Sequence, residues 1–414
     1  MDVSTLQAGK ADAKKRYARR AQTGVLLGDS LEEQGGEIPA GDAYGVANSA
    51  PGAPRVNPDT RIFSAWTWAN VLLKQALSIV ANYGIGGNTT SQILARVNDV
   101  IALNPGWVII TAGTNNMGVT GGVAQAKSDI TAMFDAFEAA GIRVAILTLP
   151  PRISGSYTGT MKADTLQLNE WIRQQARSRR GVVVADAFAA LADGVASNYL
   201  TLIAGFNPTV DGIHMAATGA YAAGTALAVA LQPHVTVLTP YSSPTPGANL
   251  LSNGRPAGTT TSAPTGWNVS GGTGLVWSDQ LRSDGLRFWK RLVIGSGTVT
   301  LGYNATVDGT RLAVGDTVNA IGEFSVSAMD QAAAIDAQGI ALSVRAYNGS
   351  AYTGTRYAFN YFRGPNVPHE GAMRVPDFVV PAGTTLLTFQ WELRGAMTFD
   401  FDKVGIYARK TYPV

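Results

Sequence analysis

The stretch Thr23-Gly-Val-Leu-Leu-Gly-Asp-Ser30 decides the fold of the N-terminal half of this chain. A short continuous apolar run that stops at a Gly-Asp-Ser turn predicts a buried strand of a parallel sheet. The turn would expose the Ser30 hydroxyl just past the carboxyl end of that strand. A serine nucleophile also needs a base, a group that orients the base, and donors for an oxyanion. The rest of the chain can therefore be searched for these three partners.

Further short apolar runs, each bounded by glycine, proline or polar turns, predict four more buried strands: Ile79–Asn82, Trp107–Thr111, Val144–Leu149 and Val182–Ala185. Segments with helical periodicity separate them, and an alanine-rich helix is expected over Ala216–Leu231. Alternating strands and helices predict an α/β fold, with a parallel sheet covered by helices on both faces. A site in such a fold lies at the carboxyl ends of the strands.

Three more polar stretches follow in order: Gly86-Gly-Asn-Thr89, Gly113-Thr-Asn-Asn116 and Asp211-Gly-Ile-His214. Together with Gly28-Asp-Ser30 they resemble the four sequence blocks of the SGNH (GDSL-type) hydrolases. The resemblance implies a flavodoxin-like three-layer domain over residues 23–236 that hydrolyses esters through an acyl-enzyme.

The resemblance also implies the catalytic roles. Ser30 would be the nucleophile, His214 its base, and Asp211 the carboxylate that orients His214. His214 is favoured among the three histidines of the chain even without the family, because His234 ends a helix and His369 lies in the second half. Asp29 is expected to stabilise the turn through backbone amides, whereas Asp186 is a structural candidate without an evident partner.

The oxyanion donors implied by the resemblance are the Ser30 amide, the Gly87 amide and the Asn115 side chain. The third block departs from the family at Asn116, where an aspartate that supports the loop is usual. This departure leaves the catalytic assignment intact and puts only the support of the loop in question.

The bulk composition excludes several classes of site. The chain has no cysteine, which rules out disulfides, thiolate metal sites and a cysteine nucleophile. No metal-ligand spacing, phosphate loop or complete dinucleotide fingerprint occurs, so no metal and no cofactor are expected. A net charge of +3 does not favour nucleic acid, and no apolar run approaches the length of a membrane span.

The 414 residues predict more than one domain. Residues 1–22, which are rich in lysine and arginine, are expected to form a solvated helical leader. Residues 237–247 have the composition of a linker. Residues 248–414 alternate in the manner of an antiparallel sandwich, with strand signals at Arg287–Ile294, Thr298–Tyr303, Ala341–Tyr347, Thr384–Trp391 and Thr398–Tyr407. The segments near Asn249 and Phe399–Tyr407 resemble the first and last strands of jelly-roll carbohydrate-binding modules.

These features favour an esterase that removes short acyl groups, acetyl above all, from a polysaccharide. Trp66 and Trp68 are candidate sugar-stacking residues, with packing of a helix on the sheet as the alternative. Two other functions stay open: a lipase or carboxylesterase on acyl chains, and a non-catalytic adhesion or tail protein.

The chain resembles bacteriophage tail-associated deacetylases in its lack of cysteines, its lack of a signal-peptide core and its sandwich. An extracellular or virion location is therefore expected, with a secreted bacterial esterase as the competing setting. A tail setting would favour a trimer, although no long heptad run specifies a coiled coil.

Overall fold

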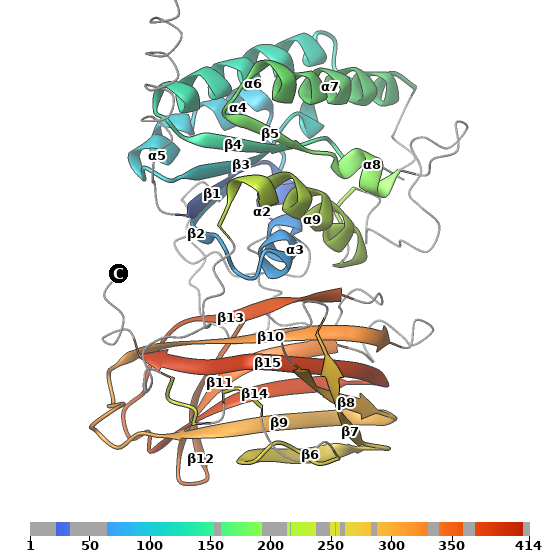
Figure 1. Cartoon of the computed structure of the whole chain (residues 1–414). Coiled ribbons are helices and arrows are strands. Elements are labelled where there is room, and N and C mark those ends of the chain that lie inside the picture. The colour runs from blue at the N-terminus through green and yellow to red at the C-terminus, as the bar shows by residue number, and fades with distance from the viewer. Residues whose placement is uncertain are drawn as a thin grey trace, which may run out of the picture. The chain divides into compact units, whose positions relative to one another are not determined.

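The computed structural model describes residues 22–33, 64–152, 159–192, 213–215, 217–236, 249–252, 254–256, 261–282, 288–329, 339–358 and 369–408 (Figure 1). The chain divides into two compact units, residues 1–70 with 76–236 and residues 71–75 with 237–414. Residues 1–21 of the predicted leader and all of the predicted linker lie outside the described residues.

The first unit contains a five-stranded sheet in the order β2-β1-β3-β4-β5, in which every pairing is parallel. The strands are β1 (Thr23–Gly28), β2 (Ser78–Gly84), β3 (Trp107–Thr111), β4 (Arg143–Leu147) and β5 (Val182–Ala185). The predicted parallel sheet is confirmed. Since β2 and β3 lie on opposite sides of β1, the strand order reverses there, and ligands of open α/β sheets bind at such a point.

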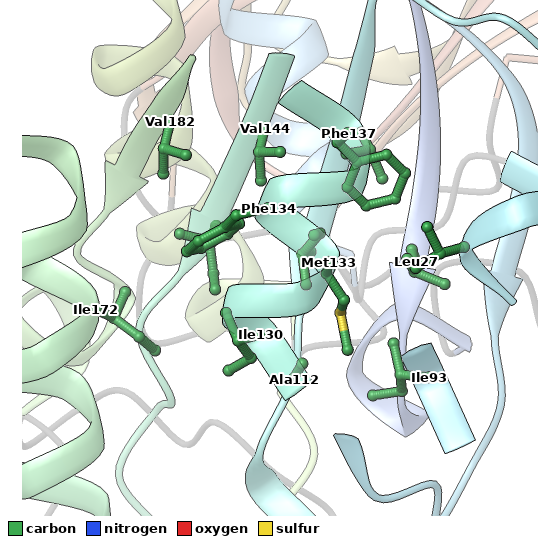
Figure 2. Close-up of a cluster of buried hydrophobic side chains, with 14 of the residues drawn as sticks. Leu27, Ile93, Ala112, Ile130, Met133, Phe134, Phe137, Val144, Ile172 and Val182 are labelled. Atoms are coloured by element: carbon green, nitrogen blue, oxygen red, sulfur yellow. The ribbon is translucent and has the colours of Figure 1, made fainter. Parts of the chain in front are cut away.

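Four helices cover one face of this sheet (Figure 1): α4 (Thr90–Leu94), α5 (Val97–Ala102), α6 (Gly122–Ala139) and α7 (Gly159–Ser178). Their apolar side chains form one buried cluster with alternate strand residues, as Figure 2 shows for Phe134, Phe137 and Val144. The intervening strand residues Leu26 and Ile109 are buried on the opposite face. This two-sided burial explains why the strands are continuous apolar runs.

Helices α3 (Ala65–Leu72), α8 (Ala187–Leu191) and α9 (Ala217–Leu231) complete the unit on the other side. Gly224 in α9 lies so close to α3 that a Cβ there would stand 2.5 Å from the Cβ of Trp68. The alanine-rich helix predicted from Ala216 to Leu231 is present as α9. Its small residues allow the close approach to α3.

The second unit consists of two antiparallel five-stranded sheets, as predicted for a sandwich. One has the order β13-β10-β15-β8-β7, and the other β12-β11-β14-β9-β6. Aromatic side chains join the two, among them Trp267 with Phe401 at 4.9 Å and Trp391 with Phe399 at 5.3 Å between ring centroids. The first sheet uses β7 (Val276–Leu281), β8 (Phe288–Ile294), β10 (Thr317–Met329), β13 (His369–Val379) and β15 (Met397–Ala408), and the second uses β6 (Trp267–Thr273), β9 (Ser296–Thr306), β11 (Gly339–Asn348), β12 (Ala351–Tyr357) and β14 (Leu386–Arg394).

The first and last strands predicted for the second unit have different outcomes. The closing strand is present as β15. From the expected opening strand, Asn249 forms only an isolated antiparallel bridge with Tyr407. Its side chain nevertheless ties this segment to β15, because Asn249 Nδ2 donates to the Val404 carbonyl at 2.9 Å.

The turn after β1 leads directly into the short helix α2 (Ser30–Glu33), and glycines on two strands make room for it. A Cβ on Gly28 would stand 2.7 Å from Glu32 Cγ, and a Cβ on Gly84 would stand 2.3 Å from the Glu33 amide nitrogen. Any larger residue would push α2 away from β1 and β2. The position of Ser30 thus depends on these two close approaches.

Glu32 holds α2 against the neighbouring strands through its buried carboxyl and its backbone carbonyl. The Thr111 hydroxyl donates to Glu32 Oε1 at 2.7 Å, and Asn82 Nδ2 donates to the Glu32 carbonyl at 2.9 Å. Burial raises the pKa of Glu32 to about 8, and the nearby negative charge of Asp29 acts in the same direction. The Glu32 side chain is therefore mostly protonated at neutral pH.

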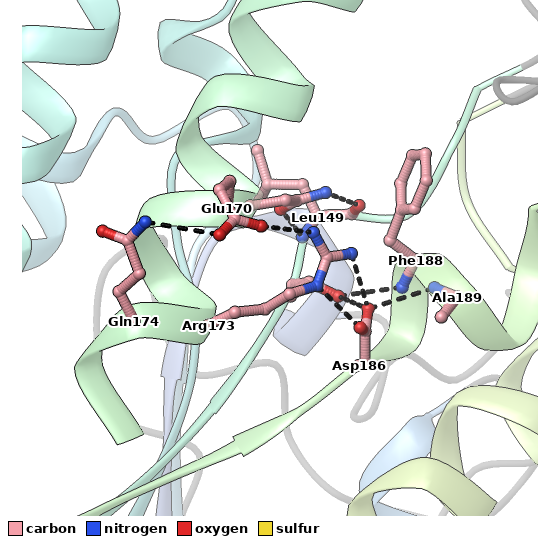
Figure 3. A network of polar contacts seen from close by, with 9 residues as sticks. Leu149, Glu170, Arg173, Gln174, Asp186, Phe188 and Ala189 are labelled. Carbon is pink, nitrogen blue, oxygen red and sulfur yellow. Dashed lines mark hydrogen bonds and ion pairs between the residues drawn. The ribbon is translucent and has the colours of Figure 1, made fainter. Parts of the chain in front are cut away.

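The carboxyl end of β5 is fixed by Asp186, for which the structure supplies the partners that the sequence did not show (Figure 3). Asp186 accepts from Arg173 Nε at 2.7 Å and Nη2 at 3.1 Å, from the Thr148 hydroxyl at 3.0 Å, and from the Ala189 amide at 3.1 Å. Burial works to raise the Asp186 pKa, but the bonds from Arg173 and the Ala189 amide hold that pKa below its usual value. Asp186 is thus the N-cap of α8 and joins it to α7 and β4.

Replacing Glu32 by glutamine should change how stability depends on pH. The raised pKa means that the folded protein binds more protons than the unfolded chain between pH 4.5 and 8. The free energy of unfolding of the wild type should therefore fall across that window. Glu32→Gln keeps an oxygen for the Thr111 hydroxyl and cannot ionise. Its midpoint temperature relative to wild type should rise from pH 5 to pH 8, and a difference that stays constant across the window would contradict a buried neutral acid.

Replacing Asp186 by alanine should destabilise the first unit by ~1–3 kcal/mol, because a charge-assisted arginine pair and a helix cap are lost together. Asp186→Asn should cost less, since its side-chain oxygen still caps α8. Urea unfolding of the two variants measures the difference. Equal losses would show that the cap contributes little and that the charge of the pair dominates.

Candidate active site

Ser30 is the first residue of α2 and is half-buried. The amides of Glu32 and Glu33 donate to the Asp29 carbonyl at 3.2 and 3.0 Å, and the Leu31 amide donates to Asp29 Oδ1 at 3.0 Å. Asp29 therefore stabilises the turn as expected. Amides in the first turn of a helix have no partner within the helix, so α2 itself does not use the Ser30 amide.

The Asp29 carboxyl shows which groups surround this turn. Its burial is complete and raises its pKa to about 6. The Leu31 amide and the positive charge of Arg152 act in the opposite direction. Arg152 Nη2 also donates to the Thr114 carbonyl at 2.9 Å, so this cation belongs to the loop of the third block.

The second block lies directly beside the serine. A Cβ on Gly86 would stand 3.8 Å from the Ser30 Cβ, and the Gly86 amide donates to Glu33 Oε2 at 2.6 Å. Gly87 has a φ of +76°, and no heavy atom of the described residues lies within 4 Å of the position where its Cβ would stand. Among the described residues nothing therefore covers the Gly87 side of the turn, and a residue with a side chain would be strained there by the positive φ.

The third block touches the second through Asn115. This residue lies in the 3₁₀ turn η2 (Thr114–Asn116) after β3, and its Nδ2 donates to the Asn88 carbonyl at 3.0 Å. A carboxamide nitrogen carries two hydrogens, so one bond of this kind leaves a second donor. This bond places the Asn115 carboxamide beside the second block.

Asn116, the departure from the family pattern, still supports the loop. Its Oδ1 accepts from the Thr90 amide at 3.0 Å at the start of α4, a bond that an aspartate would also make. Asp129 in α6 continues this support, since it accepts from the hydroxyls of Thr90 and Ser91, each at 2.7 Å. The substitution at Asn116 therefore changes the charge of the loop but keeps its hydrogen bond.

Arg96 is a structural residue of the site that the sequence did not single out. Its Nη2 donates to the Gly28 carbonyl at 2.9 Å, and its Nη1 donates to the Gln92 carbonyl at 2.9 Å and to Asn88 Oδ1. Burial lowers the Arg96 pKa, and the charges of Asp29 and Asp99 raise it. One guanidinium thus holds the first and second blocks together. The only sequence signal is a cation placed between the apolar residues Ile93 and Val97 of a predicted helix face.

The remaining predicted site residues have different outcomes. His214 is described and half-buried, whereas Asp211 lies outside the described residues. Trp66 and Trp68 are exposed to only 3% and 0%, and Trp68 packs edge-on against Tyr221 at 5.5 Å between centroids. A sugar needs an exposed ring face, so this burial argues for the packing role of both tryptophans rather than for contact with substrate.

Comparisons with solved structures found matches at low sequence identity. A lipolytic protein of the G-D-S-L family from Desulfitobacterium hafniense is 20% identical, with 51% of this chain and 99% of that chain covered at a TM-score of 0.37. An acetyl xylan esterase is 16% identical, with 50% and 99% covered at 0.35. The enzymatically active domain of tailspike protein 4 from bacteriophage CBA120 is 11% identical, with 39% and 21% covered at 0.27. The comparison with curated proteins found no match.

The comparison with protein families gave a match over the first unit, to the GDSL-like lipase/acylhydrolase family, at residues 26–222. This range begins within β1 and ends within α9, so it includes all four blocks. Within the described residues, no helix has the length and apolar composition needed to cross a membrane. Residues 26–222 of this chain form a domain of the GDSL-like lipase/acylhydrolase family.

Proposed function

We propose that the first unit is a serine esterase that removes short acyl groups, acetyl above all, from a glycan. The observation that carries the proposal is the meeting of three blocks at the switch point of the sheet. Gly86 lies beside Ser30, and Asn115 of the third block bonds to the second block.

In the proposed reaction the Ser30 hydroxyl attacks the ester carbonyl while His214 accepts its proton. Asp211 orients His214 and stabilises the imidazolium. The carbonyl oxygen becomes negative and is stabilised by the Ser30 amide, the Gly87 amide and the Asn115 side chain. The intermediate expels the alcohol, which takes the proton from His214. Water then attacks the acyl-serine while His214 takes its proton, and the second tetrahedral intermediate breaks the bond to Ser30 Oγ, which regains the proton from His214 as the acid leaves.

The chemistry of the described residues near Ser30 supports a small acyl group. The second block presents Gly86, Gly87 and Asn88, and the third presents Asn115; none of them carries a long apolar side chain. A long acyl chain would need an apolar groove to leave water. A lipase is therefore the second candidate. The extracellular or virion location, the glycan partner and a trimeric state stay predictions from the sequence.

Ser30→Ala and His214→Ala should each reduce ester hydrolysis by at least about 10³-fold, because nucleophile and base act as one unit. The double variant should be little worse than either single one. The rates are measured as acetate release from acetylated glycans and as hydrolysis of p-nitrophenyl acetate, butyrate and octanoate. Activity should fall steeply beyond the shortest esters. Full activity of Ser30→Ala would disprove the mechanism, and a preference for octanoate would favour the lipase.

Arg96→Met should lower kcat for p-nitrophenyl acetate by about 10- to 100-fold with little change in KM, because a small displacement of oxyanion donors acts mainly on the transition state. Arg96→Lys should recover part of the loss, since a lysine can still donate to the Gly28 carbonyl. Arg179→Met is the matched control, because Arg179 pairs with Asp135 at 2.6 Å on the outside of α6 and α7. If Arg96→Met only lowered the melting temperature and left kcat unchanged, Arg96 would be structural alone.

A further inference from the structure

The outer face of the sheet β12-β11-β14-β9-β6 carries a polar groove with a volume of about 310 Å³. Its floor comes from alternate residues of adjacent strands, with Asn268 on β6, Gly302 on β9 and Gln390 on β14 in one row across the sheet. Their sequence neighbours Leu301 and Phe389 are buried on the inner face. The groove is therefore built by the register of the sheet, with Gly302 at its centre.

Gly302 creates part of the hollow because it has no side chain. Its backbone is not in the left-handed region, and a Cβ there would stand 3.3 Å from the Thr388 Cγ2 atom. A strand glycine without a conformational need marks a place where something approaches closely. A residue with a side chain at this position of β9 would fill part of the groove.

Side chains that lack charge line the groove. Thr300, Asn304, Thr388 and Gln390 supply hydroxyl and carboxamide groups. The Thr388 hydroxyl donates to Asn304 Oδ1 at 2.9 Å. Gln390 lies beside Arg345, and in the carboxamide orientation that satisfies both of its polar atoms the oxygen accepts from Arg345 Nη2 at 3.0 Å.

Arg345 does not give this groove a preference for charged ligands. Arg345 is paired with Glu392 at 3.1 Å on the same face, so its charge is largely compensated. A charged ligand would meet no uncompensated partner among the lining residues. Neutral donors and acceptors of this kind match a ligand rich in hydroxyl groups.

One end of the groove is aromatic. Tyr347 lines it and packs edge-on against Tyr352, with ring centroids 6.0 Å apart and Tyr352 exposed to 60%. An aromatic ring gives an apolar face for the C–H side of a sugar ring, while its hydroxyl stays in water. A peptide strand is disfavoured, because the groove lies on the face of the sheet, where the backbone groups are already paired.

From this combination we propose that the groove binds a neutral oligosaccharide, with Tyr347 against one ring and Asn268, Thr388 and Gln390 on its hydroxyl groups. The second unit then holds the chain on the glycan whose esters the first unit cleaves; this last link, but not the binding itself, rests on the proposed function. Holding the enzyme near its substrate raises the effective concentration of the ester without changing the chemistry.

The test measures binding of the full chain carrying Ser30→Ala to an array of neutral and anionic oligosaccharides, followed by calorimetry with the best ligand. A neutral oligosaccharide should bind, and Gly302→Val should weaken it at least tenfold. Thr298→Val is the matched control, because Thr298 is exposed on the same face of β9 but lies outside the groove. It should bind as the parent does.

Gln390→Ala provides a second variant if Gly302→Val fails to fold, as judged by its melting temperature, and it should also weaken binding. Binding of anionic glycans alone, of no glycan, or equal binding by the parent, Gly302→Val and Gln390→Ala would overturn the proposal. The esterase mechanism is tested separately, by comparing hydrolysis of p-nitrophenyl acetate by the wild type and by Ser30→Ala. A failure of the groove and a failure of the esterase mechanism are therefore read from different measurements.

Discussion

A single carbonyl oxygen, that of Gly28, is the point on which the arrangement of the site depends. It accepts from the Ile85 amide at 3.1 Å, which continues the β1–β2 pairing, and from Arg96 at 2.9 Å. The same guanidinium reaches Asn88, so the strand end, the serine turn and the second block are held by one group. Because donors for an oxyanion act only when they are placed in advance, this link between backbone and side chain connects the fold to the chemistry.

The sequence predicted much of the first unit because the signals there are physical and local. Val25, Leu27 and Val144 are buried on a sheet covered on both faces, and such burial gives continuous apolar runs. The four blocks were found by their resemblance to the SGNH hydrolases, and the close contacts of Gly28 and Gly84 show why the strand ends beside them need glycine. Arg96 and Glu32 could not be found in this way. Their roles depend on partners 68 and 79 residues distant in the sequence, which no local pattern reveals.

The second unit was predicted as a class more readily than strand by strand. Strands such as β14 and β15 alternate core aromatics with polar residues and stand out. Strand β6 contains Ser270, Gly271 and Gly272 and resembles a loop by composition. The groove was equally hidden, since Asn268, Gly302 and Gln390 become neighbours only when three strands are in register. Among the aromatic residues of this unit, Trp267 and Trp391 are buried, whereas Tyr352 is exposed.

The buried Glu32 couples the folding of this protein to the uptake of a proton. In neutral solution the unfolded chain carries this side chain as a carboxylate, whereas the folded unit holds it mostly as the neutral acid. Folding at pH 7 therefore takes up about one proton from the solvent at this site. The heat of folding must then include the ionisation heat of the buffer, and it will differ between phosphate and Tris by the amount that one proton carries.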